Sequence, residues 1–334
     1  MLRFVVRRLM LLVPILVGLS ILVFLWIHAL PGNPAIALLG ERATPASVAQ
    51  FRRQYGLDKP IYTQYVAWAK TTLKGDFGYS IQDRRKVTSD FFDRFPSTLE
   101  LAVAAMLVAV LLGIPLGFIA AKHYGGWLDH SSLVVSLVGI STPVFFLAII
   151  LKYLFAIKLH WLPTVGRISV LIDTPHPTNF YVLDAIIQGD WTALWDVLKH
   201  LILPALALGS IPLAIIARIT RAAVVDVQNE DYVRTARAKG LAPRIVDRRH
   251  VLRNALLPIS TIIGLQTGFL LSGAILTETV FDRPGVGTWL YSAISYRDYP
   301  VLEAGILFLS ILFVLVNLLV DISYAIINPR IRYS

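Results

Sequence analysis

The sequence predicts an all-α membrane protein with six membrane-spanning helices. Hydrophobic residues make up 56% of the 334 residues and charged residues only 16%, and the mean hydropathy is +0.66. This composition is too apolar for a soluble domain of such length. Six stretches hold the roughly 20 apolar residues that a helix needs to cross a bilayer. They cover residues 9–30, 98–121, 131–157, 201–222, 255–278 and 302–327.

Basic residues set the expected orientation. Arg3, Arg7 and Arg8 precede the first span, and the positive-inside rule therefore places the N-terminus in the cytoplasm. The apolar run of this span is too long for a cleavable signal peptide, so it is expected to remain as a helix. Six crossings return the C-terminus, with Arg330 and Arg332, to the cytoplasmic side.

Two domains are expected. Residues 1–97 comprise the first span and a long external loop, and residues 98–334 form a core of five spans with a cytoplasmic loop at 218–253. Within the external loop, Pro45 opens a helix that Gly56 closes, and Pro60 opens a second helix that ends before Gly75. The sequence Ser97-Thr98-Leu99-Glu100 reads as a capping box that begins the second span.

The loop 218–253 is strongly basic. Nine basic residues face only four acidic ones, Asp226, Glu230, Asp231 and Asp247. The basic residues are Arg218, Arg221, Arg234, Arg237, Lys239, Arg244, Arg248, Arg249 and Arg253. The excess predicts a cytoplasmic loop.

A short helix is expected inside this loop. Asn229 is a good N-cap, and Gly240 supplies a left-handed stop. Acidic residues occupy the first turn and basic residues the last, as the helix dipole favours. A capped helix in a loop of a membrane protein is suited to docking a soluble partner, and Ala236 is expected on the face that presses against it.

Small residues recur every fourth position in the second span, at Ala105, Ala109, Gly113, Gly117 and Ala121. Such a stripe lets another helix approach closely. We expect that helix to belong to the same chain rather than to a second subunit.

The residues indicate no catalytic, cofactor-binding or metal site. Phosphate binding would need a Gly-rich loop that ends in Gly-Lys-Ser/Thr, which the sequence lacks. The sequence has no cysteine, and its seven histidines are scattered; it also has no recognisable nucleophile motif. Glu278 and Glu303 fall near predicted span ends, where solvent or lipid headgroups are expected to reach them.

Polar or kinked points within the spans can line an aqueous pathway. They are Ser141-Thr142-Pro143 in the third span, Ser210 in the fourth, and Gln266-Thr267 in the fifth. Helix bending and hydrogen bonding between helices explain these residues equally well.

Two motifs lie in and after the basic loop: Arg234-Thr235-Ala236-Arg237-Ala238-Lys239-Gly240-Leu241 and His250-Val251-Leu252-Arg253-Asn254-Ala255-Leu256-Leu257-Pro258. They resemble motifs of permease subunits of binding-protein-dependent ABC importers, in the dipeptide, oligopeptide and nickel branch. Others are Leu30-Pro31-Gly32-Asn33-Pro34, Gly75-Asp76-Phe77-Gly78-Tyr79-Ser80, Arg297-Asp298-Tyr299-Pro300 and Asn328-Pro329-Arg330-Ile331-Arg332. The long segment from Arg167 to His200 is more similar to that of dipeptide permeases than to the shorter segment of oligopeptide or nickel permeases. Within such an importer, the chain resembles the first of the two permease subunits.

The resemblance implies the type I importer fold in a bacterial inner membrane. The implied partners are a second homologous permease, two cytoplasmic ATPases that hold ATP and Mg, and an external substrate-binding protein. The cargo would be dipeptides or short oligopeptides. The implied coupling helix comprises Glu230, Asp231, Tyr232, Arg234, Thr235, Ala236, Arg237, Lys239 and Gly240, with Arg253 nearby. Arg234 replaces the glutamate that names the family's EAA motif, which puts that residue's salt bridges in doubt.

Other solutes and other classes stay open. Permeases of this branch also serve nickel, glutathione and other small solutes. A secondary transporter that needs no ATPase would predict inverted repeats and ion-coupling charges near the midplane, and the sequence shows neither.

Overall fold

The computed structural model describes residues 2–29, 35–36, 43–54 and 56–327. In these ranges the regular structure is helical, with an isolated β-bridge between Tyr79 and Lys86. Some predicted features lie outside the described ranges. They are the motifs at 30–34 and 328–332, the C-terminal arginines and part of the external loop. Two compact units emerge, Met1–Pro96 with Pro284–Leu315 and Ser97–Arg283 with Val316–Ser334. We call them unit 1 and unit 2; the division expected after residue 97 stays a prediction.

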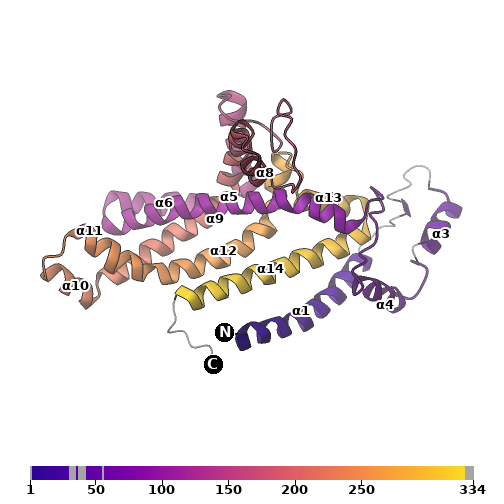
Figure 1. The fold of residues 1–334 in the computed structure, drawn as a ribbon, viewed down its shortest axis with the longest axis horizontal. Coiled ribbons are helices and arrows are strands. Elements are labelled where there is room, and N and C mark those ends of the chain that lie inside the picture. The colour runs from indigo at the N-terminus through magenta and orange to yellow at the C-terminus, as the bar shows by residue number, and fades with distance from the viewer. Residues whose placement is uncertain (1, 30–34, 37–42, 55, 328–334) are drawn as a thin grey trace. The chain divides into compact units, whose positions relative to one another are not determined.

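Unit 1 contains both helices predicted in the external loop. Its helices are α1 (Leu2–Ala29), α3 (Pro45–Gln54), α4 (Ile61–Thr72), the start of α5 (Val87–Lys122), α13 (Val286–Tyr296) and the start of α14 (Tyr299–Ile327), as labelled in Figure 1. Gly56 (φ 66°) and Gly75 (φ 82°) follow α3 and α4 in the left-handed region, where a side chain would be strained. The helix limits predicted from proline and glycine are therefore confirmed.

Two of the motifs that resemble the family, at residues 75–80 and 297–300, pack together in unit 1. Asp298, just before α14, accepts hydrogen bonds from the Ser80 hydroxyl at 2.6 Å and from the Gln82 backbone N–H at 3.1 Å. The ring of Phe77 lies 4.5 Å from that of Phe308. The conformation of the loop at 75–82 thus depends on the start of α14, far away in sequence.

The second span begins earlier than predicted, and the prediction of a capping box at its start is wrong. Helix α5 starts at Val87, so Ser97, Thr98 and Glu100 lie within it. Their side chains are buried. Thr98 donates to Glu278 at 2.6 Å, and Glu100 accepts from Arg167 at 2.9 Å. These polar residues have tertiary partners, so they do not mark a helix end.

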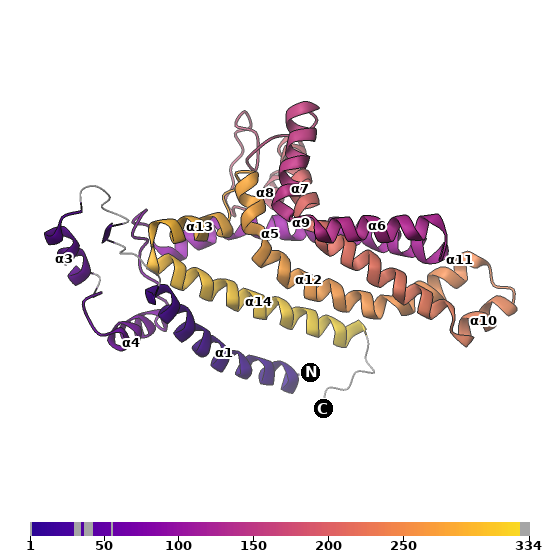
Figure 2. The same cartoon turned by 180° about the vertical axis from the view of Figure 1, so that it is seen from behind.

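Helix α9 lies at the centre of unit 2. The unit contains α6 (Trp127–Ser141), α7 (Val144–Leu151), η2 (Lys152–Lys158), α8 (Tyr181–Gln188), α9 (Trp191–Gln228), α10 (Asp231–Ala238), α11 (Pro243–Ile245), η3 (Val246–Leu252) and α12 (Arg253–Val280). Helix α9 contacts α6, α7, α8 and α12, and both ribbon views show α6 and α12 running beside it (Figures 1 and 2).

Helix α9 also begins before the predicted fourth span. Asp190 caps it by accepting the Ala193 backbone N–H at 2.9 Å. This bond and a second from the Thr174 hydroxyl lower the pKa of Asp190. The cap extends the helix through a polar segment that hydropathy assigns to the loop.

Among the described residues, length and composition allow between three and five crossings, and α1 adds a shorter apolar stretch, Val13–Ala29. Three long helices qualify directly: Val87–Lys122, Trp191–Gln228 and Tyr299–Leu318. The expected third span is broken, because α6 and the helix after it differ in direction by 104°. Pro143 stands at the break as the residue before α7; a proline disfavours helical conformation in the residue before it. The predicted kink is therefore confirmed, but the third span is not one continuous helix.

The small-residue stripe packs against α9 in the same chain, as expected. A Cβ at Gly113 would lie 3.0 Å from the Leu213 carbonyl oxygen, and one at Gly209 would lie 2.6 Å from that of Ala105. No side chain fits between the backbones at these points. The stripe thus fixes the α5–α9 contact within unit 2.

Candidate functional site

The short helix predicted in the basic loop exists as α10, a two-turn helix between α9 and α11. Its inner face carries Val233 and Ala236, which are buried against Val246 and Val251 of η3. Its outer face is open, with Tyr232 43% exposed. Because the buried positions recur at three-residue spacing, one face of α10 packs against the rest of the protein and the opposite face remains accessible.

This arrangement overturns the expected role of Ala236. We predicted that Ala236 would press against a partner, but its side chain is only 6% exposed and belongs to the chain's own apolar cluster. Helical spacing gives two opposite faces without saying which one is covered. Only the packing of η3 against α10 decides it.

The ends of α10 are partly as predicted. Gly240 adopts φ 74°, and its N–H donates to the Arg237 carbonyl at 3.0 Å, so the left-handed stop is confirmed. The N-cap is Glu230 rather than Asn229. Asn229 instead ends α9, where its amide donates to the Val225 carbonyl at 3.1 Å.

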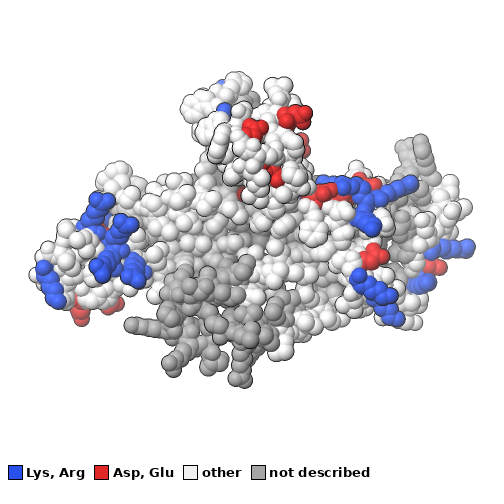
Figure 3. All heavy atoms as spheres, viewed as in Figure 1, with Lys and Arg blue, Asp and Glu red and all other residues white. Residues whose placement is uncertain are grey.

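Basic side chains gather over α10 and α11 in the space-filling view (Figure 3). Exposed members of this basic surface are Arg234, Arg237, Lys239, Arg244, Arg248, Arg249 and Arg253. Arg234 and Asp231 approach to 3.6 Å with both side chains largely exposed, so their attraction adds little stability. The surface is therefore available to an acidic partner or to anionic lipid.

Two ion pairs fix the helices on either side of α10. Lys122, at the end of α5, pairs with Asp247 of η3. Arg221 of α9 forms a two-pronged pair with Asp129 of α6, with Nη2 to Oδ2 at 2.7 Å. Gly125 donates a backbone N–H to the same carboxylate at 3.0 Å. Sequence reasoning missed both pairs, although charges beside otherwise apolar spans were a usable signal.

The expected pathway residues differ in their burial, and three of their hydroxyls bond within their own helices. The hydroxyls of Thr142, Ser210 and Thr267 donate to carbonyls one turn earlier in their own helices, at 2.7–2.8 Å. Ser210 lines a largely apolar cavity of about 380 Å³ among α5, α6 and α9. Gln266 is buried, whereas Ser141 and Pro143 are exposed.

Unit 2 also holds a buried charge cluster that sequence reasoning missed. Arg167 donates to Glu100 at 2.9 Å and to the Asn179 carbonyl at 2.6 Å. Its guanidinium lies 3.6 Å from the centre of the Tyr181 ring. Arg283 approaches Glu100 to 3.6 Å. The cluster fastens the segment after η2 to α5, since buried charges are stable only when paired.

Burial changes the pKa of Arg283, one of the two arginines in this cluster. Arg283 is fully buried, and its desolvation, with repulsion from Arg167, lowers its pKa to about 10. It therefore remains charged at neutral pH. Glu278 is also fully buried, which corrects the expectation that solvent or headgroups reach it.

Two families of known sequences match nearly the whole chain. Residues 113–333 match the family described as the binding-protein-dependent transport system inner membrane component. Residues 1–102 match the N-terminal family of the same membrane component.

Curated relatives extend over the full length. The dipeptide permease protein DppB of Alkalihalophilus pseudofirmus is 44% identical, and the di/tripeptide permease protein DppB of Pseudomonas aeruginosa is 48% identical, with 100% of each chain covered. The glutathione permease protein GsiC of Escherichia coli is 43% identical with the same coverage.

A solved structure supports the fold. The inward-facing MetNI methionine ABC transporter aligns with a TM-score of 0.51 at 16% identity, covering 70% of this chain and 93% of that one. Together with the family matches, this shows that the chain belongs to the family of inner-membrane components of binding-protein-dependent transport systems.

Proposed function

We propose that this chain is a permease subunit of an ATP-driven importer of dipeptides or short oligopeptides. The observation that carries the proposal is the full-length identity of 44% and 48% to two permeases named for dipeptide and di/tripeptide transport. With a second, homologous permease it would form the pathway, and an external binding protein would deliver the cargo.

The outer face of α10 is the proposed contact with an ATPase. It comprises Glu230, Asp231, Tyr232, Arg234, Thr235, Arg237, Lys239 and Gly240, with Arg253 beside it. Two cytoplasmic ATPases would bind ATP and Mg, and this chain would bind neither. The packing of α10 supports the proposal. Because its inner face is packed against the chain, a displacement of α10 by a partner would move α9 and α12 with it.

The proposed topology has six crossings with both termini in the cytoplasm. Helix α1 would supply the first crossing. The two bent pairs, Trp127–Ser141 with Val144–Lys158 and Pro243–Leu270 with Ala274–Val280, would supply two others. The break at Ser141, Thr142 and Pro143, together with Ser210, Gln266 and Thr267, is the proposed place for the path, because irregular backbone at membrane depth is tolerated where it lines a cavity.

Reconstitution tests the proposal. Proteoliposomes containing this chain, its second permease and both ATPases should take up labelled dialanine only with ATP and the external binding protein. The isolated chain should hydrolyse no ATP. Uptake by this chain alone, driven by an ion gradient, would instead indicate a secondary transporter.

Glutathione is the second candidate, favoured by the 43% identity to a glutathione permease. The same proteoliposomes separate the candidates when labelled dialanine, glutathione and nickel compete for uptake. ATP-dependent uptake of glutathione or nickel without uptake of dialanine would reject the peptide assignment and leave the importer class intact.

A change at Gly240 tests coupling. A Cβ at this position meets no atom within 4 Å, so Gly240→Ala carries only the left-handed strain of about 1 kcal/mol. Gly240→Trp should leave the chain inserted but reduce ATPase binding and uptake. Normal assembly and uptake with Gly240→Trp would show that α10 is merely a basic loop segment.

A further inference from the structure

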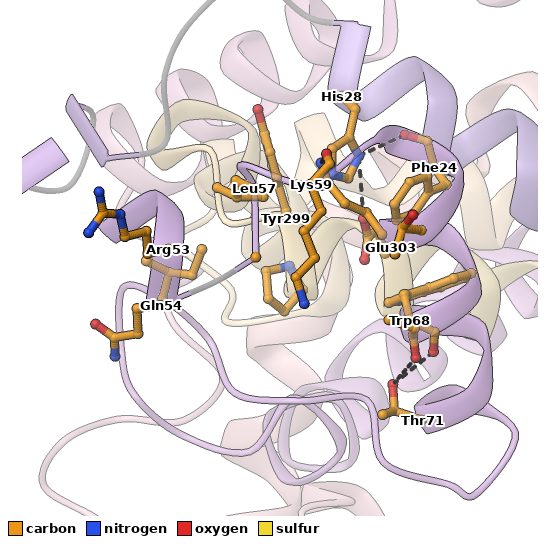
Figure 4. A pocket seen from close by; sticks show the side chains of 16 residues that line it. Phe24, His28, Arg53, Gln54, Leu57, Lys59, Trp68, Thr71, Tyr299 and Glu303 are labelled. Atoms are coloured by element: carbon orange, nitrogen blue, oxygen red, sulfur yellow. Dashed lines mark hydrogen bonds and ion pairs between the residues drawn. The ribbon is translucent and has the colours of Figure 1, made fainter. Parts of the chain in front are cut away.

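Unit 1 contains a pocket that none of the expected coupling or pathway residues lines. Its volume is about 430 Å³, and it lies among α1, α4, the end of α3 and the start of α14. Ligand sites occupy about 300–1,000 Å³, so the pocket is large enough for a small molecule. Figure 4 shows the side chains of His28, Trp68, Tyr299 and Glu303 at this pocket; they belong to α1, α4 and α14.

A buried carboxylate opens into this pocket. The Glu303 side chain is 6% exposed, and the His28 ring lies beside it, with Nδ1 3.7 Å from Oε1. The same nitrogen lies 2.9 Å from the Phe24 carbonyl oxygen, so its proton is directed there. Within the described part of the chain, Glu303 accepts no hydrogen bond. A buried carboxylate without a donor is costly, and a ligand that brings a donor would remove that cost.

Aromatic rings line the same pocket as this carboxylate. Phe24 stacks on His28 with ring centres 4.1 Å apart, and Trp68 lies 5.6 Å from Phe24. Tyr299 lies 4.9 Å from His28. The faces of aromatic rings attract cations. A carboxylate set among such rings therefore favours an ammonium group over a neutral or anionic ligand.

Cationic side chains also line the pocket, from α3 and the turn before α4. Arg53 and Lys59 contribute to the lining, and both are exposed. A molecule that places an ammonium group at Glu303 can direct a carboxylate toward them. The pocket thus complements a small zwitterion.

We propose that this pocket binds a short peptide, with its amino terminus at Glu303 between the aromatic rings and its carboxylate toward Arg53 and Lys59. The inference deepens the proposed function and rests on it, because peptides are the expected cargo. It gives the permease chain a peptide site of its own, separate from that of the external binding protein.

Calorimetry on the purified importer, without the external binding protein, tests the site. L-alanyl-L-alanine should bind, whereas its N-acetyl derivative, which lacks the cation, should bind at least about tenfold more weakly. Glu303→Gln, which keeps the side-chain shape, should weaken dialanine binding by a similar factor. Asp173→Asn, at an exposed loop carboxylate in unit 2, should not change it.

A structural role for Glu303 is separable from binding. Because its carboxylate accepts no hydrogen bond from the described residues, Glu303→Gln should not lower the unfolding midpoint of the ligand-free importer. Equal binding of the N-acetyl peptide, or unchanged dialanine binding by Glu303→Gln, would overturn the inference. Uptake assays on the wild-type importer test the proposed function independently. If the wild type takes up dialanine but Glu303→Gln binds dialanine as tightly as the wild type does, only the pocket is rejected.

Discussion

Replacing Arg221 with methionine should destabilise the chain by about 3 kcal/mol. The Asp129 side chain is 3% exposed and accepts two bonds from Arg221 and one from the Gly125 N–H. Arg221→Met leaves that carboxylate buried with a single donor. Removing one partner of a buried pair costs about 3–5 kcal/mol. The lower end applies because Arg221 is 20% exposed, which allows some access to solvent.

A double-mutant cycle separates this pair from general packing. Asp129→Asn should cost about 1–2 kcal/mol, since the arginine it leaves can reach solvent. The double variant should be more stable than the sum of the two single changes predicts, by about 1–2 kcal/mol. Unfolding in mixed detergent and sodium dodecyl sulfate micelles, followed by circular dichroism, measures each free energy. Strictly additive effects would refute the idea that the two residues stabilise the α6–α9 contact as a pair.

Three further predictions concern the surface and its loops. Ala236→Trp should lower the unfolding midpoint, because overpacking a core costs about 1–3 kcal/mol, whereas Tyr232→Ala should leave the midpoint unchanged and weaken ATPase binding in a pull-down. A cysteine at Thr71 should react with an impermeant reagent in intact cells and one at Arg244 only after permeabilisation; the reverse pattern would contradict the proposed topology. Burial lowers the pKa of His176 below its usual 6.5, so the folded state binds this proton more weakly and stability should fall as the pH drops below about 6.5. His176→Asn should lessen that fall in pH-dependent thermal unfolding, and identical profiles would exclude a contribution from this residue.

Local chemistry predicted the elements whose limits are set by backbone preference. Proline and glycine marked α3 and α4 because their backbone restrictions act within a few residues. Gly240 was identified as a left-handed stop for the same reason. Pro143 was recognised as a kink, although its angle of 104° depends on what α6 and α7 pack against.

Polar residues in the spans were harder to interpret. Ser97-Thr98-Leu99-Glu100 has the pattern of a capping box, yet Glu100 pairs with Arg167 and Thr98 with Glu278. A side chain can satisfy either its own backbone or a distant partner, and sequence spacing does not distinguish the two.

The sequence by itself determined the membrane class, the basic loop, the limits of the short helices and the small-residue stripe, because composition, charge and backbone restriction are local properties. Tertiary structure alone decided that Ala236 faces inward and that Glu278 and Glu303 are buried. It also brought Phe24, Trp68, Tyr299 and Glu303 to the lining of one pocket. Burial depends on which segments pack together, and those segments are distant in the chain, so no local pattern specifies it.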